Sequence, residues 1–158
     1  RCNAGRASSH SSPVAFPSLR KFEAEVVAMS ADLLGGAGQA AGSMSSGGTE
    51  SILAAVYAAR QWAHRRRPEA HPPEMLLPAS AHPAFDKAAQ YLGVRAVRIP
   101  VGADFRADPA AMRAACTPNT VLLVGSAPSY PQGVIDPIPE IAALAQERGI
   151  LCHVDACV

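Results

Sequence analysis

The sequence predicts an α/β fold with a mostly parallel sheet and flanking helices. From residue 74 onward, strand and helix patterns alternate as strand, helix, strand, helix, strand, helix, strand. Such alternation is typical of parallel sheets joined by right-handed crossovers. Segments 120–125 and 150–155 are largely apolar, as expected of strands buried on both faces. With 158 residues, the chain is long enough for one domain with a real core.

The composition excludes several classes of protein. The chain is 49% hydrophobic and 17% charged, which indicates a globular and not a disordered protein. Its formal net charge of +1 gives no support for nucleic-acid binding, and no apolar run approaches the ~20 residues that span a bilayer. The four cysteines form no Cys-x-x-Cys pair, which favours a reduced, cytoplasmic setting; a membrane anchor before residue 1 is left open. No metal site is expected, because Cys152, His153 and Cys157 match no usual zinc spacing.

The chain opens with a segment that carries no periodicity. Residues 1–17 are rich in Ser, Arg and Pro, so we expect an irregular lead-in, and we expect residues 18–158 to belong to one domain. Apolar residues recur at helical spacing over 19–34, and the glycines that follow end this helix. A Gly/Ser loop, 42–49, then precedes a helix predicted over 50–66.

The remaining elements are short and bounded by proline or glycine. The expected strands are 74–78, 94–101, 120–125 and 150–155. The expected helices are 83–92, 108–116 and 138–148. Strand 94–101 alternates, which predicts partial exposure, and Asp108-Pro109 is a typical helix start.

Three features of this chain could carry chemistry. Glycines and hydroxyls before a helix form a ready phosphate site, although Thr49 or Ser46 could simply cap that helix. His82 follows the first strand and could stack on a flat ligand, act as an acid or base, or cap the next helix. Asp155 ends the last strand, where a carboxylate needs a partner: a cationic ligand group, a helix to cap or a salt bridge. Carboxyl ends of strands are where ligands collect in open α/β sheets.

One ligand would use all three features. It needs a phosphate for the Gly/Ser loop, a flat ring for His82 and a basic ring nitrogen for Asp155. Pyridoxal phosphate has these three parts, and a carboxylate beside its nitrogen keeps the ring an electron sink. The residues therefore predict pyridoxal phosphate as the cofactor.

Five separated motifs resemble a known family. Segment 45–52 (SSGGTESI) is similar to the phosphate loop of the group II pyridoxal-phosphate-dependent decarboxylases, and segment 153–157 (HVDAC) to their aspartate motif. Three further segments resemble the sphingosine-1-phosphate lyase branch of that family: 16–27, 80–89 and 133–140. The resemblance covers about residues 13–158.

This resemblance implies part of the large cofactor-binding domain of a fold-type I enzyme. By it, Gly48 and Thr49 would hold the cofactor phosphate, and His82 would stack on the pyridine ring. Asp155 would pair with the ring nitrogen, and Cys157 would lie near the opposite face of the ring. The implied cofactor-binding residues, with Ser126 as a weaker polar contact, are Gly48, Thr49, His82, Ser126, Asp155 and Cys157.

The implied activity is cleavage of a phosphorylated long-chain base to a fatty aldehyde and ethanolamine phosphate, in a homodimer when full length. Such an enzyme needs a Schiff-base lysine, and neither Lys21 nor Lys87 matches the family's lysine. We therefore expect a fragment that is inactive alone and carries no catalytic residue. An Asn-x-x-His pair expected before Phe16 is replaced by Ser9 and Ser12, which keeps an amino-acid decarboxylase of the same family open. A non-catalytic phosphate-binding module is the third reading.

Overall fold

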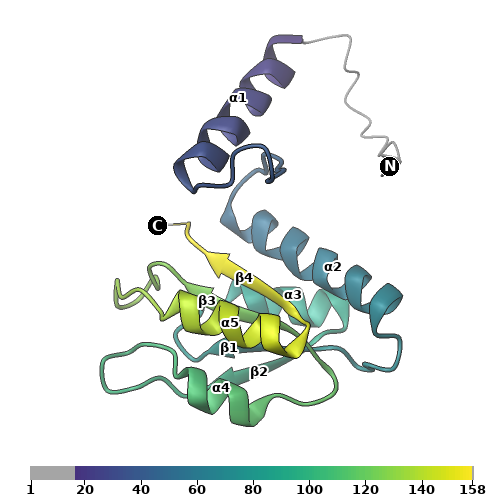
Figure 1. Ribbon diagram of the computed structural model, residues 1–158, viewed down its shortest axis with the longest axis vertical. Helices are drawn as coiled ribbons and strands as arrows, with labels where there is room; N and C mark the ends of the chain where they lie inside the picture. Colours follow the sequence, from purple (N-terminus) through teal and green to yellow (C-terminus); the bar gives the residue numbers. More distant parts are fainter. Residues whose placement is uncertain (1–16, 158) are drawn as a thin grey trace. The chain divides into compact units, whose positions relative to one another are not determined.

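The computed structural model describes residues 17–157 (Figure 1). The chain divides into two compact units, of which the first ends at Ser45 and the second begins at Ser46. Most of the expected lead-in, with Ser9 and Ser12, lies outside the described residues. Pro17, its last residue, already begins the first helix. That residues 18–158 belong to one domain stays a prediction.

The first unit consists of helix α1 (Pro17–Leu33) and the segment that follows it. The helix ends in a glycine turn, as expected: the Gly36 amide donates to the Ala31 carbonyl at 2.7 Å, and Gly35 has a φ of 71°. None of the helix's residues is buried, and Phe22 is 59% exposed. The apolar spacing over residues 19–34 therefore predicts the helix correctly, although α1 buries none of its residues within the described part of the chain.

The second unit is built on a parallel sheet of four strands, which confirms the predicted fold class. The strands are β1 (Glu74–Pro78), β2 (Arg95–Ile99), β3 (Thr120–Ser126) and β4 (Leu151–Asp155). Their order is β2-β1-β3-β4, and every neighbouring pair is parallel. The chain thus moves outward from β1 to β2, then returns to the other side of β1 for β3 and β4.

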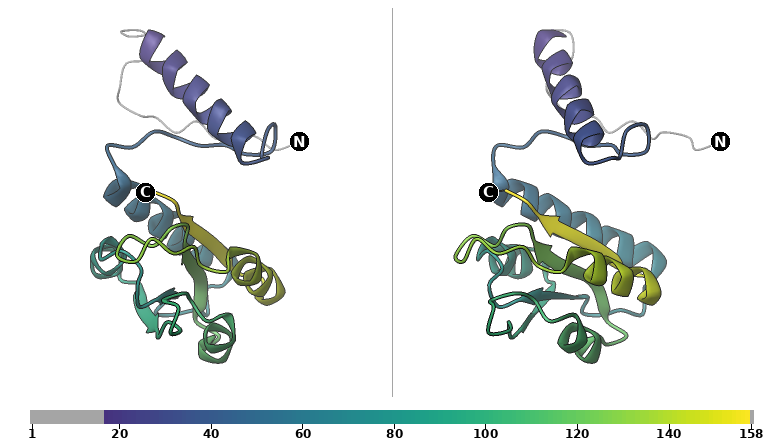
Figure 2. Two further views of the ribbon diagram at one scale, coloured as in Figure 1. Left: turned by 90° about the vertical axis from the view of Figure 1, so that its left-hand side faces the viewer. Right: turned by 60° about the vertical axis from the view of Figure 1, so that its left-hand side comes forward.

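Helices cover both faces of this sheet (Figure 2). α2 (Gly48–Arg66) and α3 (Ala84–Leu92) pack on one face, and α4 (Pro109–Ala115) and α5 (Ile138–Arg148) pack on the other. The largest fully buried side chains are Val56, Met75, Leu77 and Phe85 in the first core, and Leu76, Met112, Leu123, Ile141 and Leu144 in the second. Each core joins one sheet face to a helix pair, as in other layered α/β folds.

The two largely apolar strands have different places in the sheet. All seven residues of β3 are buried, as predicted, because β3 has a strand on either side and a helix layer on each face. The expectation that β4 is also buried is wrong. β4 is an edge strand of the described sheet, paired with β3 alone, and Cys152 is exposed. An apolar sequence cannot distinguish a central strand from an edge strand, because edge position depends on pairing and not on the strand itself.

Local signals at the helix ends are confirmed. The Asp108 carboxylate accepts hydrogen bonds from the amides of Ala110 (2.8 Å) and Ala111 (3.2 Å) and so caps α4. Gly93 and Gly149 end α3 and α5 in the left-handed conformation. Within the described residues, none of the helices combines the length and the apolar character that crossing a bilayer requires.

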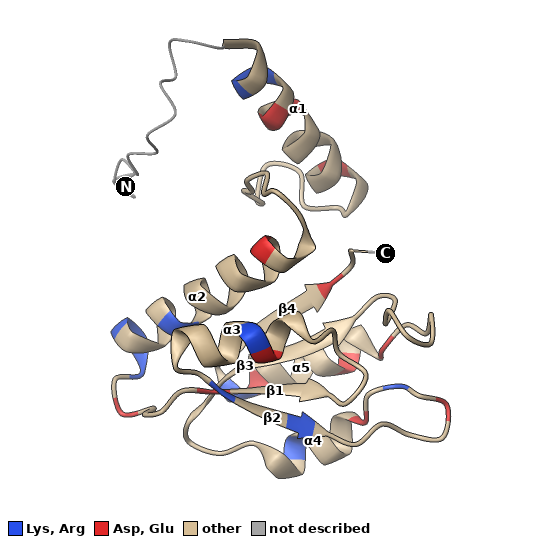
Figure 3. Ribbon diagram, turned by 180° about the vertical axis from the view of Figure 1, so that it is seen from behind, with Lys and Arg blue, Asp and Glu red and all other residues tan. Residues whose placement is uncertain are grey.

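Basic residues gather at the end of α2 in the second unit. The last turn of this helix holds His64, Arg65 and Arg66, and Figure 3 shows Lys or Arg side chains at that end of the helix. Arg65 and Arg66 are exposed in that turn, as expected of a solvated helix terminus. Arg67, just beyond it, instead donates to the Thr120 carbonyl at 3.0 Å and anchors the start of β3.

Candidate functional site

The candidate site lies where the strand order reverses. β1 and β3 are neighbours, but their onward connections run through helices on opposite faces of the sheet. Ligands of open α/β sheets bind in the crevice outside the strand ends at such a switch point. The segment after β1 carries His82, and the loop after β3 carries Pro128 and Tyr130. These three residues line one pocket of about 250 Å³.

Five of the six residues predicted from the sequence meet in this pocket. They are Gly48, Thr49, His82, Asp155 and Cys157, and Ile52, Pro128 and Tyr130 complete the lining. The pocket therefore brings together the start of α2, the turn after β1, the loop after β3 and the end of β4. Segments that are far apart in the sequence converge because parallel strands end at the same edge of the sheet.

The first turn of α2 contributes to the pocket. The helix begins at Gly48, two residues earlier than predicted, so Gly48 and Thr49 belong to this turn. The alternative that Thr49 or Ser46 occupies the cap position is wrong, because the N-cap residue is Gly47. Glu50 in the same turn accepts a hydrogen bond from the Ser46 amide at 2.6 Å. Bonds from the Ser46 hydroxyl and amide lower the pKa of the Glu50 carboxyl.

Gly48 allows a close approach between two segments. A Cβ atom at this position would lie 2.9 Å from the Cys157 Sγ atom, closer than real Cβ atoms come to other heavy atoms. Any larger residue at position 48 would have to displace the Cys157 thiol, so glycine allows the end of β4 and the start of α2 to lie this close. The N-terminus of a helix favours anions at this end of the pocket.

His82 is held in one orientation by the helix that follows it. Its Nδ1 atom accepts a hydrogen bond from the Ala84 amide at 3.1 Å, so the neutral ring carries its proton on Nε2. Pro83 offers no side-chain acceptor, and the imidazole therefore caps α3, which was one of the expected roles. The ring also packs edge-on against Tyr130, with 6.0 Å between ring centroids. Capping and lining the pocket use different parts of the same ring.

Asp155 places a half-buried carboxylate in the pocket. It accepts a hydrogen bond from the Cys157 amide at 3.3 Å, and no cation among residues 17–157 forms an ion pair with it. Neither a salt bridge nor a helix cap therefore accounts for this carboxylate in the described part of the chain. A hydrogen bond to Asp155 and burial raise the pKa of the Cys157 thiol to about 11, so the thiol is protonated.

His153 lies on β4 one pleat before Asp155. Its ring packs against Phe85 of α3, with 5.8 Å between ring centroids. Burial lowers the pKa of His153, and Asp155 opposes this shift. His153 is therefore a packing residue that joins β4 to α3 and does not line the pocket.

Ser126 is not among the residues that line the pocket. It is the last residue of β3 and is 2% exposed, and its amide donates to the Asp136 carboxylate at 2.7 Å. The same carboxylate accepts from the Ala107 amide at 2.8 Å. Asp136 thereby closes the base of the loop that presents Pro128 and Tyr130. Tyr130 ends the strand-end segment 126–130 that the sequence indicates, but it is not among the predicted site residues, although an aromatic residue beside a proline was an available signal.

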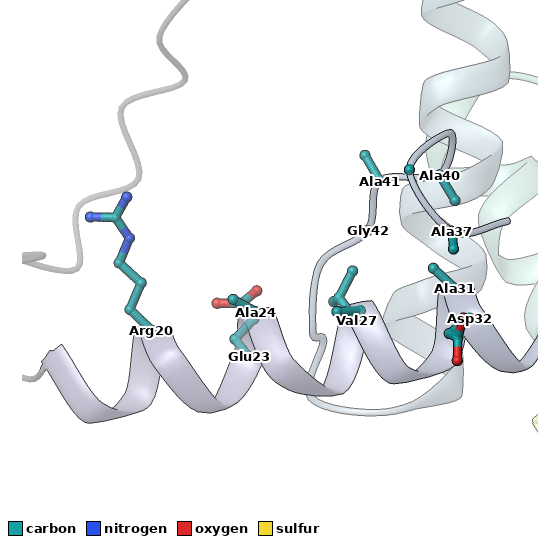
Figure 4. Close-up of a pocket in the computed structure, with 12 residues that line it drawn as sticks. Arg20, Glu23, Ala24, Val27, Ala31, Asp32, Ala37, Ala40, Ala41 and Gly42 are labelled. Atoms are coloured by element: carbon teal, nitrogen blue, oxygen red, sulfur yellow. The ribbon is translucent and has the colours of Figure 1, made fainter.

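A larger hollow belongs to the first unit and lacks such chemistry. It has a volume of about 660 Å³ and lies along α1 and the segment 37–42 (Figure 4). Alanines form much of its lining, with Arg20, Glu23 and Asp32 at its margin. None of the site residues predicted from the sequence lies in it. Size alone is therefore a poor guide to the functional site in this chain.

Neither lysine of the chain lines the pocket. Lys87 is exposed on α3, with its Nζ atom 5.6 Å from the centre of the Tyr91 ring, and it does not line the pocket. Lys21 pairs with Glu25 at 3.6 Å on α1. Across residues 17–157, no three His, Cys, Asp or Glu residues are grouped closely enough to bind a metal ion.

Fold and pocket together define a class of protein. This is an α/β protein whose switch-point pocket offers a helix terminus for an anion, a histidine ring for a flat group and a carboxylate for a cation. The aminotransferase class-V family matches residues 29–158, and the chain therefore belongs to that family.

Similar proteins give a consistent picture. The chain is 47% identical to a sphingosine-1-phosphate lyase of Arabidopsis thaliana, covering 94% of this chain and 29% of the relative. It is 49% identical to sphingosine-1-phosphate lyase 1 of Rattus norvegicus, covering 92% of this chain and 25% of the relative. A solved sphingosine-1-phosphate lyase of Burkholderia pseudomallei superposes with a TM-score of 0.85 at 44% identity, covering 90% of this chain and 34% of that one.

A more distant structure shares the fold. The Oryza sativa TDC with PLP and tryptamine superposes with a TM-score of 0.80 at 23% identity, covering 91% of this chain and 34% of that one. The expected fold of a fold-type I cofactor domain is thus confirmed. The chain spans about a quarter to a third of the length of these relatives.

Proposed function

We propose that this chain forms part of the cofactor pocket of a pyridoxal-phosphate-dependent carbon–carbon lyase. The substrate would be a phosphorylated long-chain base of the sphingosine 1-phosphate type, and the products a fatty aldehyde and ethanolamine phosphate. The convergence of Gly48, Thr49, His82, Asp155 and Cys157 in one pocket carries this proposal. The identity of 44–49% to three sphingosine-1-phosphate lyases supports the substrate class.

The residues present fit pyridoxal phosphate. Gly48 lines the pocket at the first turn of α2 and has no side chain that could stand between its backbone amide and a phosphate. Asp155 has no cationic partner among residues 17–157, and a protonated pyridine nitrogen is a partner that a half-buried carboxylate needs. When bound, the cofactor supplies a ring that accepts the electrons of the breaking bond.

Each residue of this chain has a defined task in the proposed pocket. Gly48 and Thr49 offer the first-turn amides of α2 to the phosphate. Asp155 holds a proton on the ring nitrogen, and Cys157 stays neutral beside it because of its raised pKa. His82 provides a flat face for the ring, in the orientation set by its bond to Ala84. Ser126 acts only through the loop it anchors.

A second candidate is an amino-acid decarboxylase of the same fold. A probable L-tyrosine/L-aspartate decarboxylase of Methanocella arvoryzae is 41% identical, covering 91% of this chain and 37% of that relative. The pocket residues would serve both reactions, because both need the same ring electronics. The two candidates differ in the substrate that reaches the pocket and not in the cofactor residues.

Cofactor binding is tested on the 158-residue chain by equilibrium dialysis with pyridoxal phosphate. We expect saturable binding that Asp155→Asn weakens, and no borohydride-stable adduct at Lys87 or Lys21. Equal binding by the variant would contradict the proposed pocket, and specific reduction at Lys87 would place the reactive amine elsewhere. If the wild-type chain shows no saturable binding, the non-catalytic module becomes the better explanation.

The reaction is tested on the full-length gene product. Incubation with sphingosine 1-phosphate should release a long-chain aldehyde and ethanolamine phosphate, detected by mass spectrometry. Release of carbon dioxide from tyrosine or aspartate, without cleavage of the long-chain base, would support the decarboxylase instead. The homodimer and the cytoplasmic location are further proposals, which light scattering and cell fractionation would test.

A further inference from the structure

The carboxyl end of β1 is held by a single guanidinium group from the neighbouring strand. Arg98 of β2 points its Nη1 atom at three backbone carbonyls: Pro78 at 3.3 Å, Ala79 at 3.0 Å and Ala81 at 3.2 Å. These carbonyls belong to the turn that leads from β1 to His82. An arginine fork can engage several acceptors from one fixed plane, which a single ammonium group does less well.

The other edge of the same guanidinium binds the helix that follows His82. Its Nε and Nη2 atoms donate to the two carboxylate oxygens of Asp86, at 3.3 Å and 2.7 Å. Asp86 lies in the first turn of α3, the turn that His82 itself caps. Arg98 therefore ties together both ends of the short segment that carries the imidazole.

Three backbone bonds also restrain this segment. The Ala79 amide donates to Ile99 at 2.8 Å, the Ala81 amide donates to Pro78 at 3.0 Å, and the Phe85 amide donates to the His82 carbonyl at 3.1 Å. The Ser80 hydroxyl is buried and has no hydrogen-bond partner within the described residues. The carbonyls of Ala79 and Ala81 thus depend on Arg98 for their bonds in this part of the chain.

We propose that Arg98 is a positioning residue that sets the imidazole of His82 against the ligand in the switch-point pocket. Arg98 does not line this pocket, and it acts through the turn 79–82. The proposal takes the ligand to be pyridoxal phosphate, and in this point alone it rests on the proposed function. The orientation of the unliganded imidazole does not depend on that identity.

The chain contains a matched control on the same strand. Arg95 lies at the other end of β2 and donates to the buried Glu74 carboxylate at 3.0 Å. Arg95→Gln removes one guanidinium, as Arg98→Gln does, and also breaks an ion pair. If Arg98 had only a general role in stability, the two variants would affect His82 to the same small extent.

The first readout is the tautomer of His82 in the unliganded 158-residue chain, measured by long-range ¹H–¹⁵N NMR. The His82 signals are assigned by their loss in His82→Gln. We expect the proton on Nε2 in wild type and in Arg95→Gln, and a mixture of tautomers in Arg98→Gln, because the bond from Ala84 to Nδ1 is no longer fixed. Arg98→Lys should give an intermediate result.

The second readout is the affinity for pyridoxal phosphate. Loss of one well-placed ring contact predicts about 3- to 10-fold weaker binding for Arg98→Gln, and a change of less than about 2-fold for Arg95→Gln. Asp86→Asn keeps the carbonyl contacts of Arg98 and should fall between them. This variant and Arg98→Lys serve the test if Arg98→Gln does not fold.

The outcomes separate the two proposals. Unchanged His82 signals and unchanged affinity in the Arg98 variants, with a wild-type chain that binds the cofactor, would overturn the positioning role. Equal changes in Arg95→Gln and Arg98→Gln would also overturn it, since stability alone would then explain them. Failure of the wild-type chain to bind pyridoxal phosphate would contradict the proposed function, while the NMR comparison would still decide the role of Arg98.

Discussion

The carboxylate of Asp155 controls the reactivity of a neighbouring thiol, and Asp155→Asn should release it. A hydrogen bond to this carboxylate is the largest cause that raises the pKa of Cys157 from its usual 9.0 to about 11. Burial contributes less, and the negative charge of Asp155 adds to the effect. With asparagine at position 155 the charge is gone, and the pKa of Cys157 should fall toward 9.0.

The size of the effect follows from these two pKa values. At pH 7.5, a thiol of pKa about 11 holds about 100-fold less thiolate than one of pKa 9.0. A thiolate of lower pKa is also a weaker nucleophile, with a Brønsted slope of about 0.4–0.5, which reduces the net gain to about 10-fold. Because burial still raises the pKa in Asp155→Asn, we expect Cys157 to react at most about 10-fold faster with an aromatic disulfide in this variant.

The assay quenches the reaction with acid and counts mixed disulfides at each cysteine by mass spectrometry. Cys152 is an internal reference, because Asp155 does not contribute to its raised pKa. Asp104→Asn, at an exposed loop carboxylate, is the matched control and should change neither rate. An unchanged ratio of Cys157 to Cys152 rates in Asp155→Asn would refute the bond between thiol and carboxylate.

Three further substitutions test the core, the loop and the helix start. Phe85→Ala empties a fully buried site between the sheet and α2, and urea unfolding should show a loss of about 3–5 kcal/mol; a loss below 1 kcal/mol would contradict the packing. Asp136→Ala leaves the amides of Ala107 and Ser126 without their acceptor and should lower the free energy of unfolding by about 2–5 kcal/mol in the same assay. A variant as stable as the wild type would show that Asp136 does not hold the base of the loop. Gly48→Ala should weaken binding of pyridoxal phosphate at nearly unchanged melting temperature, because its Cβ would displace the exposed Cys157 thiol. Equal affinity would show that the close contact between Gly48 and Cys157 does not matter for binding.

Much of the fold follows from local sequence signals. Apolar periodicity reports which residues face a core, and proline, glycine and Asp108 mark where elements begin and end. These signals act within a few residues, so they can be read without knowing the rest of the structure. The α/β alternation was therefore predictable, as were the helix end at Gly149 and the cap at Asp108.

The candidate residues were also visible in the sequence, because each carried a local signal. Gly48 stands in a glycine run before a helix, and His82 and Asp155 each follow an apolar strand. What each residue contacts was not visible. The cap on α3 that His82 supplies depends on Ala84, but the position of Tyr130 beside it depends on the loop from a different strand.

By itself, the sequence determined the type of each element, the fold class and the short list of chemically useful residues. Only the tertiary structure decided that β4 is an edge strand, that Ser126 is buried away from the pocket, and that Arg98 holds the turn before His82. The physical reason is that periodicity records burial along one segment. Strand order and the meeting of distant side chains depend on which segments pair, and that is a property of the folded chain.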